Sequence, residues 1–553
     1  IICELVYQNA TSEVFYQAFC HYLPHLCNLL ARGGERYEDV QVLKPIGSMV
    51  LECGELFLGM LLQTPAVLQS LIPAILNLSS HPDQVIVELT FNFWTELELI
   101  LEGAEESTKE AFVPVYVDLF RCLLPRLQFP PETQIQSAEE RESFRDFRHI
   151  IGDCLKDCVR VSGSTAAVEL ILTAVEQAMA RSNQWQPIEA VLFALRTVAS
   201  VIDRRESERL PTLFPLLLTL RSHPRLIYSC LLVIGCLSDW LKYHQDLLPA
   251  AIDYIVMGLT TPGDSEVTAA AAMAMRYLCE SCGDLMVRYA EQLLTLYDTV
   301  MSQMVLEEED QLSLTESICH VIVADVHQIA TLLPLALNKF TTKLTSVDTK
   351  PEQVNLALQH LALFIELIVP DSISIISTTF PMTLIYQRDI EPVLPVIVER
   401  CGDVVSEGTS ALLKAAISRY SRSLGQSWLL QTVTLCQHLY TLNKFPQAVY
   451  TLRYAVLLGD CNVVVQRQII SHIRDNFAIY AQKPLDCLNM ITSMYDYWRY
   501  ISVPNDPLSD VLPHSLITLI TGIVKDSSQG AAELSAALIV ALRMAMHAGS
   551  VTN

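Results

Sequence analysis

The sequence predicts an all-α fold that consists of one extended array of helix pairs. Apolar residues recur at positions i, i+3, i+4 and i+7 in almost every segment, which is the period of an amphipathic helix. The breaks between these segments are short and fall at Pro, Gly, Asn or Asp, and no strand pattern alternates with the helices. Apolar residues make up 51% of the 553 residues and charged residues only 18%, which excludes intrinsic disorder.

Similar helices recur at a regular interval, and the interval indicates the type of array. They are expected to begin at Pro187, Pro224, Glu266 and Asp310, so successive starts lie 37, 42 and 44 residues apart. Proline suits the first helical turn because its missing N–H would have no partner there. Intervals of roughly 40 to 47 residues are typical of HEAT and armadillo repeats. We therefore predict a superhelical α-solenoid of HEAT repeats that runs as one array over residues 1–553.

The same helical period assigns several residues to the interior. His21 and His25 are four residues apart beside apolar neighbours, which favours a core or groove position over a metal-binding pair. Large aromatic residues fall among aliphatic residues at helical spacing. We predict that these aromatic residues belong to the core: Phe91, Phe93, Trp94, Trp185 and Trp240.

Two connections are longer or more polar than the others. Phe129–Arg148 is predicted to be a charged insertion that starts with proline, and Val503–Pro513 a turn rich in Pro and Asp. The acidic run Glu307–Asp310 opens a helix, where carboxylates interact favourably with the helix dipole. A functional acidic patch is the alternative for this run.

Charge and cysteine content restrict the class of partner and the compartment. The 37 basic and 61 acidic residues give a net charge of −24, which argues against direct binding of nucleic acid. The 16 cysteines form no disulfide-like framework, so they are interpreted as reduced residues of a cytosolic or nuclear protein. The sequence contains no uninterrupted stretch of about 20 apolar residues, so it does not predict a membrane-spanning helix. The chain starts at Ile1 with no signal pattern, and we expect it to be an internal fragment.

The sequence offers no set of residues suited to catalysis. Phosphate-binding glycine loops, zinc-protease motifs and serine-hydrolase motifs do not occur. Cys279 and Cys282 form a C-x-x-C pair, but no second pair follows at zinc-binding spacing. Cys154 and Cys158 are one helical turn apart, and both pairs are interpreted as buried core residues. We expect a protein that is not an enzyme and that needs neither a cofactor nor a metal.

One basic segment is unusual in so acidic a chain. Lys414, Ser418 and Arg422 recur at i, i+4 and i+8 on one helix face, with Arg419 next to it. No acidic residue occurs between Gly408 and Lys444, so a positive stripe could bind phosphate or carboxylate groups. The alternative is solvated charge at a helix end before Gly425.

A second basic group alternates with acidic residues, which favours pairing within one helix. Its basic members are Arg145, Arg148, Lys156 and Arg160, and its acidic members are Asp146, Asp153 and Asp157. Pairs at i, i+3 or i+4 contribute only a few tenths of a kcal/mol each.

Several distinctive segments occur in order over about residues 80–285. They are His81-Pro82 with Val85 and Val87-Glu88, the run from Phe91 to Trp94, Phe144–Val159, Trp185 with Glu189–Phe193, and Tyr254–Leu259. Together these segments resemble the transportin-SR family of importin-β-like nuclear import receptors. The acidity of the chain favours a fungal or other non-animal member.

The resemblance implies a HEAT-repeat receptor that shuttles between cytoplasm and nucleus. Receptors of this family carry SR- and RGG-rich RNA-binding proteins, release them when Ran-GTP binds, and contact FG nucleoporins. The family's amino-terminal Ran-binding repeats are expected to be missing from this chain.

The resemblance also implies a cargo-binding helix in the later repeats. Animal members hold phosphorylated serine–arginine dipeptides with an arginine-rich helix, and Leu412–Leu424 falls at that place, within a candidate cargo-binding repeat at 408–445. Arg422 matches the family pattern, and Lys414 and Arg419 are nearby substitutes. This departure suits an unphosphorylated, arginine-rich cargo.

Three other functions stay open. An export receptor on the same scaffold would bind cargo more tightly with Ran-GTP, whereas an import receptor would release it. A HEAT-repeat regulatory scaffold for a kinase or phosphatase would not respond to Ran. A catalytic protein is the weakest alternative because the motifs for catalysis are absent.

Overall fold

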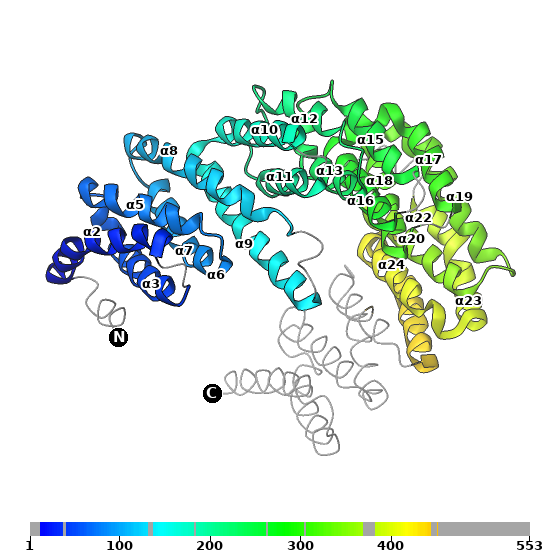
Figure 1. Ribbon diagram of the computed structural model, residues 1–553. Helices are drawn as coiled ribbons and strands as arrows, with labels where there is room; N and C mark the ends of the chain where they lie inside the picture. The colour runs from blue at the N-terminus through cyan, green and yellow to red at the C-terminus, as the bar shows by residue number, and fades with distance from the viewer. Residues whose placement is uncertain are drawn as a thin grey trace, which may run out of the picture. The chain divides into compact units, whose positions relative to one another are not determined.

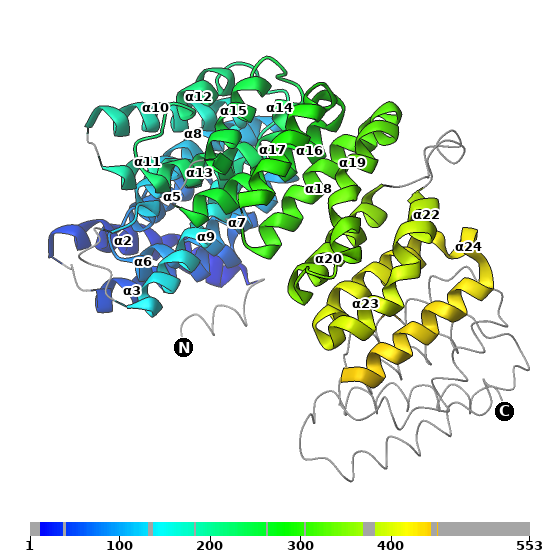
Figure 2. The same cartoon turned by 90° about the vertical axis from the view of Figure 1, so that its right-hand side faces the viewer.

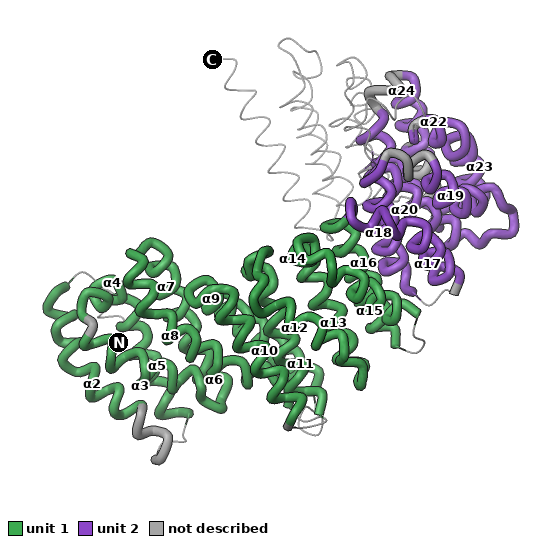
Figure 3. The backbone as a smooth tube through the Cα atoms, turned by 90° about the horizontal axis from the view of Figure 1, so that it is seen from above, with its two compact units in different colours: residues 1–282 green, residues 283–553 purple. Residues whose placement is uncertain are grey.

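The computed structural model describes residues 12–36, 40–130, 137–181, 184–260, 264–303, 306–368, 382–443 and 451. Within these residues every regular element is a helix and none is a strand, which confirms the all-α prediction. The chain divides into two compact units, residues 1–282 and 283–553 (Figure 3).

Unit 1 consists of helix pairs in two layers. Its helices are α2 (Glu13–Arg36), α3 (Val40–Leu56), α4 (Leu58–Leu61), α5 (Pro65–Ser79), α6 (Gln84–Glu88), α7 (Phe91–Glu102), α8 (Glu106–Leu123), η1 (Leu124–Leu127), α9 (Ala138–Ser162), α10 (Ser164–Arg181), α11 (Trp185–Val198), α12 (Leu210–Leu217), α13 (Pro224–Cys236), α14 (Ser238–Leu241), α15 (Leu248–Thr260) and α16 (Ser265–Met286), which runs across the division. In the first layer α2, α5, α8, α10 and α12 contact one another in turn, and in the second layer α3, α7, α9, α11 and α13 do (Figure 1).

Unit 2 repeats the same arrangement. Its helices are η2 (Val287–Tyr289), α17 (Ala290–Gln303), α18 (Glu308–Ala324), α19 (Val326–Thr345), α20 (Pro351–Leu367), α22 (Met382–Ile385), η4 (Tyr386–Ile390), η5 (Glu391–Val393), α23 (Leu394–Cys401), η6 (Gly402–Val405) and α24 (Ser406–Asn443). Helix α17 contacts α19, while α18, α20 and α24 pack in succession beside them (Figure 2).

The interval between corresponding helices of successive pairs confirms the repeat predicted from the sequence. Helices α11, α13, α16, α18 and α20 begin at residues 185, 224, 265, 308 and 351, so their starts lie 39, 41, 43 and 43 residues apart. These intervals are close to the HEAT spacing of roughly 40 residues and exceed the 34 residues of a TPR repeat. Each pair buries its apolar faces against its neighbours, which is how a HEAT-type solenoid is stabilised.

The predicted insertion at Phe129–Arg148 is wrong in its second half, because α9 already begins at Ala138. Ser137 caps this helix: its hydroxyl accepts a hydrogen bond from the Glu140 N–H at 3.0 Å, and the Glu140 carboxylate accepts one from the Ser137 N–H at 3.1 Å. This capping box supplies partners for two backbone donors and fixes the start of the helix. The other predicted connection, Val503–Pro513, lies outside the described residues.

Most of the predicted aromatic core is confirmed. Phe91, Phe93, Trp94 and Trp240 are each at most 8% exposed. Trp94 also has its polar atom satisfied, since its indole N–H donates to the Ser79 hydroxyl at 2.9 Å. Such a partner offsets the cost of burying the indole N–H.

Two predictions about the interior are wrong. Trp185 is only half-buried, because it is the first residue of α11 and stacks on His223 with ring centroids 5.1 Å apart. His21 and His25 are exposed on α2, because that helix buries the stripe that carries Leu23 and Cys27 instead.

The cysteine pairs have the predicted core positions. Cys154, Cys158, Cys279 and Cys282 are all buried and free. Burial raises the pKa of Cys279 and raises that of Cys282 to about 11, so both thiols stay protonated near neutral pH.

Candidate partner-binding surfaces

The basic segment predicted from the sequence lies on α24. Lys414 and Arg419 are half-buried on this helix, and Ser418 between them is exposed. The side chain of Arg422 lies outside the described residues, as do residues 444 and 445 of the candidate cargo-binding repeat. Helix α24 continues to Asn443, so the alternative that placed these charges at a helix end before Gly425 is wrong.

Arg419 uses part of its guanidinium to hold α24 against α20. Its Nη2 atom donates to the backbone oxygen of Glu366 at 2.6 Å, in the last turn of α20. Carbonyl groups at a helix C-terminus lack partners within the helix, and a cationic side chain there is favourable. Its Nε atom is buried and makes no hydrogen bond among the described residues.

The second basic group only partly pairs within α9. Lys156 pairs with Asp153 at 2.9 Å and Arg160 with Asp157 at 2.5 Å, as predicted. Arg148 does not, because it is buried and both Glu189 oxygens accept hydrogen bonds from its Nη2 at 2.9 and 2.8 Å. The prediction of intrahelical pairing is therefore wrong for Arg148, whose partner lies on α11.

Aromatic rings enclose this buried ion pair. The Arg148 guanidinium carbon lies 4.2 Å from the Phe129 ring centroid and 4.0 Å from that of Phe193. Burial raises the pKa of Glu189 although Arg148 opposes the shift, and burial lowers the pKa of Arg148. Because both charged groups are enclosed in this way, the pair joins α9 to α11 and is not available to a partner.

Acidic side chains gather on neighbouring second-layer helices of unit 1. Glu55 on α3 is half-buried and accepts a hydrogen bond from the Asn92 amide on α7 at 2.7 Å. Its pKa is raised by burial and then by the charges of Glu52 and Glu96. Glu52 and Glu96 carry the same charge as Glu55 and repel it. This part of the second layer is therefore negatively charged.

A further acidic group lies between α7 and α9. Glu98 and Asp157 are only 6% and 5% exposed, and Glu102 stands one turn beyond Glu98. The Thr95 hydroxyl donates to Asp157 at 2.9 Å, and Arg160 pairs with the same carboxylate. Sequence analysis missed Glu98, since nothing in its local pattern separates a buried glutamate from an exposed one. The acidic surface as a whole follows only from the net charge.

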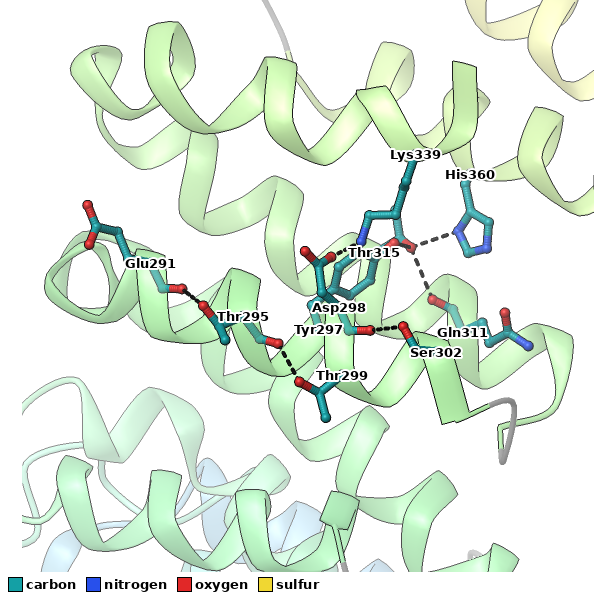
Figure 4. Close-up of polar contacts among 10 residues, drawn as sticks. All are labelled: Glu291, Thr295, Tyr297, Asp298, Thr299, Ser302, Gln311, Thr315, Lys339 and His360. Carbon is teal, nitrogen blue, oxygen red and sulfur yellow. Dashed lines mark hydrogen bonds and ion pairs between the residues drawn. The ribbon is translucent and has the colours of Figure 1, made fainter. Parts of the chain in front are cut away.

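The buried polar network of unit 2 has a structural role. Figure 4 shows Tyr297, Thr315 and His360 on three helices, with the Thr315 hydroxyl 2.7 Å from both the Tyr297 hydroxyl and His360 Nδ1. The hydrogens are consistent when the two neighbours donate to Thr315 and Thr315 donates to the Gln311 carbonyl at 3.1 Å. His360 Nε2 is then a buried acceptor without a hydrogen-bond partner among the described residues. Burial lowers the pKa of His360 to about 3, so the imidazole is neutral and joins α17, α18 and α20.

Lys339 lies next to this network. Its ammonium group pairs with Asp298 and lies 4.1 Å from the Tyr297 ring centroid (Figure 4). Burial, and then the charge of Lys343, lowers the pKa of Lys339 to about 8. The ammonium group of Lys339 thus contacts both a carboxylate and an aromatic ring on α17. This lysine therefore helps to pack α17 against α19.

The acidic run Glu307–Asp310 has the predicted capping position. Glu307 precedes α18, and the next three acidic residues form its first turn. The pKa of Asp310 is raised by burial and by Glu309 and Glu307. Within the described residues, no helix is long and apolar enough to cross a membrane, and no group of three or more His, Cys, Asp or Glu could hold a metal ion.

Two family models match the chain. They are the second and third TPR domains of Transportin-3/Importin-13, which match residues 38–125 and 214–296. Among curated proteins, the mRNA transport regulator MTR10 of Saccharomyces cerevisiae is 30% identical over 285 residues, which are 50% of this chain and 29% of that protein. Transportin MOS14 of Arabidopsis thaliana is 26% identical over 325 residues, which are 54% of this chain and 34% of that protein. The chain thus matches about a third of the length of these relatives.

Solved structures share the fold. Importin13 in its cytosolic state matches with a TM-score of 0.69 and 17% identity, over 92% of this chain and 65% of that one. Kap95p, described as inducing the switch loops of RanGDP to adopt the GTP-bound conformation, matches with a TM-score of 0.52 and 13% identity, over 99% of this chain and 64% of that one. At these identities the likeness extends to the HEAT-repeat architecture.

Proposed function

We propose that the chain is part of a nuclear import receptor of the karyopherin-β family. The observation that carries this proposal is the match of the Transportin-3/Importin-13 models to residues 38–125 and 214–296. Both segments consist of helix pairs of the kind that receptors of this family stack. The receptors of this family are not enzymes, and we propose the same for the whole protein.

The proposed cycle depends on competition between two partners. Cargo binds in the cytoplasm, the receptor passes FG nucleoporins, and Ran-GTP releases the cargo in the nucleus, so the protein shuttles between the two compartments. The likeness to Kap95p, whose printed description concerns Ran, supports Ran as a partner. Stacked repeats contact mainly their neighbours, so small changes at each interface let one scaffold adapt to different partners.

The proposed cargo is an SR- or RGG-rich RNA-binding protein. The cargo-binding residues that we propose on α24 are Lys414, Arg419 and Arg422. The partial exposure of Lys414 and Arg419 supports contact with carboxylate or phosphate groups of the cargo, although one Arg419 nitrogen is already engaged by Glu366. Basic cargo segments would bind acidic surface by charge complementarity.

The test measures cargo binding with and without Ran-GTP. We expect an SR/RGG-rich protein to bind the chain and to be released by Ran-GTP. Charge reversal at Lys414 and Arg422 should weaken binding, whereas the matched change Lys350→Glu, at an exposed position before α20, should not. Tighter binding with Ran-GTP would assign the protein to export, and no response to Ran would leave a HEAT-repeat scaffold.

A further inference from the structure

We propose that the second-layer surface between α7 and α9 binds an arginine side chain of a partner polypeptide through Glu98, Glu102 and Asp157. This inference rests on the proposed function, since it specifies what the receptor recognises in its cargo. The three acidic residues are called the α7–α9 site below.

Glu98 is the central observation. It is 6% exposed, yet among the described residues its carboxylate takes part in no hydrogen bond and no ion pair. The Glu98 oxygens are not among the fully buried polar atoms that lack a hydrogen-bond partner. A small part of the carboxylate is therefore accessible to solvent. A buried carboxylate normally has hydrogen-bond donors, because removing the charge from water is costly. Glu98 is therefore a largely buried carboxylate whose hydrogen-bond donors this chain does not supply among the described residues.

The charges around Glu98 make its carboxylate still less stable in the ionised form. The pKa of Glu98 is raised mainly by burial, and next by the negative charge of Asp157. The positive charge of Arg160 lowers this pKa, and the charge of Glu102 raises it. Arg160 is already engaged, because it pairs with Asp157 at 2.5 Å. Asp157 shares the environment, since burial raises its pKa although Thr95 and Arg160 oppose the shift. Three carboxylates and one guanidinium leave a net negative site that attracts a second cation.

The chemistry of the site favours arginine over a metal ion. No metal-binding group of three or more acidic, histidine or cysteine side chains occurs among the described residues. A guanidinium has five donors in a planar fork, so it can bond to carboxylates on two helices at once. It is also less strongly hydrated than the ammonium group of lysine, which favours entry into a half-enclosed site.

Exposed apolar side chains also occur on α7 and α9. Leu99 follows Glu98 on α7 and is 53% exposed, and Ile150 on α9 is 43% exposed. Long basic side chains commonly lay their methylene groups on such apolar surface while the charged head reaches a polar partner. The α7–α9 site therefore combines a vacant acidic position with exposed apolar side chains on the same two helices.

The test compares two labelled peptides on the full chain by fluorescence anisotropy at about 0.15 M salt. One peptide carries RGG repeats, and its twin has every arginine replaced by lysine. We expect Glu98→Gln to weaken binding of the arginine peptide about tenfold or more and to affect the lysine twin less, because truncating one partner of a desolvated charge pair is costly. The matched control is Glu110→Gln, which removes the same charge from an exposed position on α8 and should leave both affinities unchanged.

A stability measurement separates lost binding from lost structure. Glu98→Gln removes an uncompensated buried charge, so its thermal midpoint should equal or exceed that of the wild type. Equal effects of Glu98→Gln and Glu110→Gln, or equal loss for the arginine and lysine peptides, would overturn the proposal. If Glu98→Gln weakens arginine binding but Ran-GTP releases no cargo, the site stands and the import function fails. If Ran-GTP releases cargo and Glu98→Gln has no effect, the reverse holds.

Discussion

Arg148 illustrates how one side chain can determine the contact between two repeats. Its side chain and that of Glu189 are 4% and 8% exposed, and the guanidinium lies between the rings of Phe129 and Phe193. A buried ion pair contributes little net stability, because the cost of removing both charges from water offsets their attraction. Removing only one partner is different, since it leaves the other charge buried without compensation.

We predict that Arg148→Ala lowers the free energy of unfolding by about 3–5 kcal/mol, because Glu189 then stays buried without its partner. Replacing both residues by apolar ones, Arg148→Met with Glu189→Leu, should recover most of this loss. The measurement is urea denaturation of the full chain followed by circular dichroism. Arg145→Ala, one turn earlier on the exposed face of α9, is the control and should change stability by at most about 0.5 kcal/mol. Equal effects of the two single substitutions would contradict the argument.

The partner of Arg148 could not be predicted from local spacing, but the repeat period contains a usable signal. Arg148 and Glu189 are 41 residues apart, as are Arg225 and Glu266, and Lys339 and Asp298. This separation is one repeat, so corresponding positions of adjacent repeats face each other. Local periodicity finds pairs at i, i+3 and i+4, which is why it predicted the pairs of Lys156 and Arg160 and misassigned Arg148. Glu98 carries no such signal, because its burial depends on how α7 packs against α9.

At the scale of elements, helix starts were predicted better than helix ends. The start of α13 at Pro224 was correct, and those of α11, α16 and α18 were within two residues. Starts carry chemical signals in the sequence, namely proline in the first turn and carboxylates near the dipole. Helix α24 instead continues past Gly425, because a cost of about 1 kcal/mol for one glycine is small beside the packing of a long helix.

The contact of α24 with α20 depends on a different glycine. Gly408 lies so close to Asn355 that a Cβ atom there would overlap the Asn355 backbone oxygen, while the Gly408 N–H donates to the Asn355 side chain at 2.7 Å. A backbone atom cannot move aside as a flexible side chain can. The close approach of the two helices therefore requires glycine at this position.

We predict that Gly408→Ala destabilises the packing of α24 on α20 by about 1–3 kcal/mol, as other overpacking substitutions do. Hydrogen exchange of α20 and α24 amides measures this locally and should become faster. Gly59→Ala is the control, since a Cβ atom at Gly59 meets nothing within 4 Å and alanine favours the helix. Unchanged exchange in α20 and α24 would show that alanine fits between the two helices, which would contradict the requirement for glycine.

For the whole molecule, the sequence predicted the architecture more completely than the binding surfaces. Repeat length and fold class follow from the period of apolar residues, which the helix pairs of the described residues reproduce. Binding surfaces depend instead on which side chains from different helices meet. Net charge predicts an acidic surface somewhere, but only packing brings Glu98 and Asp157 together. The basic segment on α24 was located by composition, and its role stays a prediction.

The same acidic composition leads to an expectation for pH. Burial raises the pKa of carboxyl groups in both units: Glu55, Glu98, Asp157, Glu189, Asp310 and Glu391. A group whose pKa is raised on folding binds protons more tightly in the folded state. Its stabilising contribution is complete below the unfolded pKa, about 4 for carboxyl groups, and is lost as pH rises through the folded pKa. Asp389, whose pKa is lowered by Arg388, acts in the opposite sense but is a single surface group.

We therefore predict that the protein becomes less stable as pH rises above the unfolded carboxyl pKa of about 4 and through the raised pKa values of the folded state, with a lower thermal midpoint at the higher pH. Repulsion among the charges behind the net −24 acts in the same direction. Scanning calorimetry at about 0.15 M and about 1 M salt separates the two causes, because salt screens surface repulsion and leaves the effect of burial. Glu98→Gln should make the dependence on pH shallower, since it removes one group that titrates differently in the two states. A midpoint that rises with pH over this window would mean that favourable ion pairs, rather than buried uncompensated carboxylates, control the stability of the array.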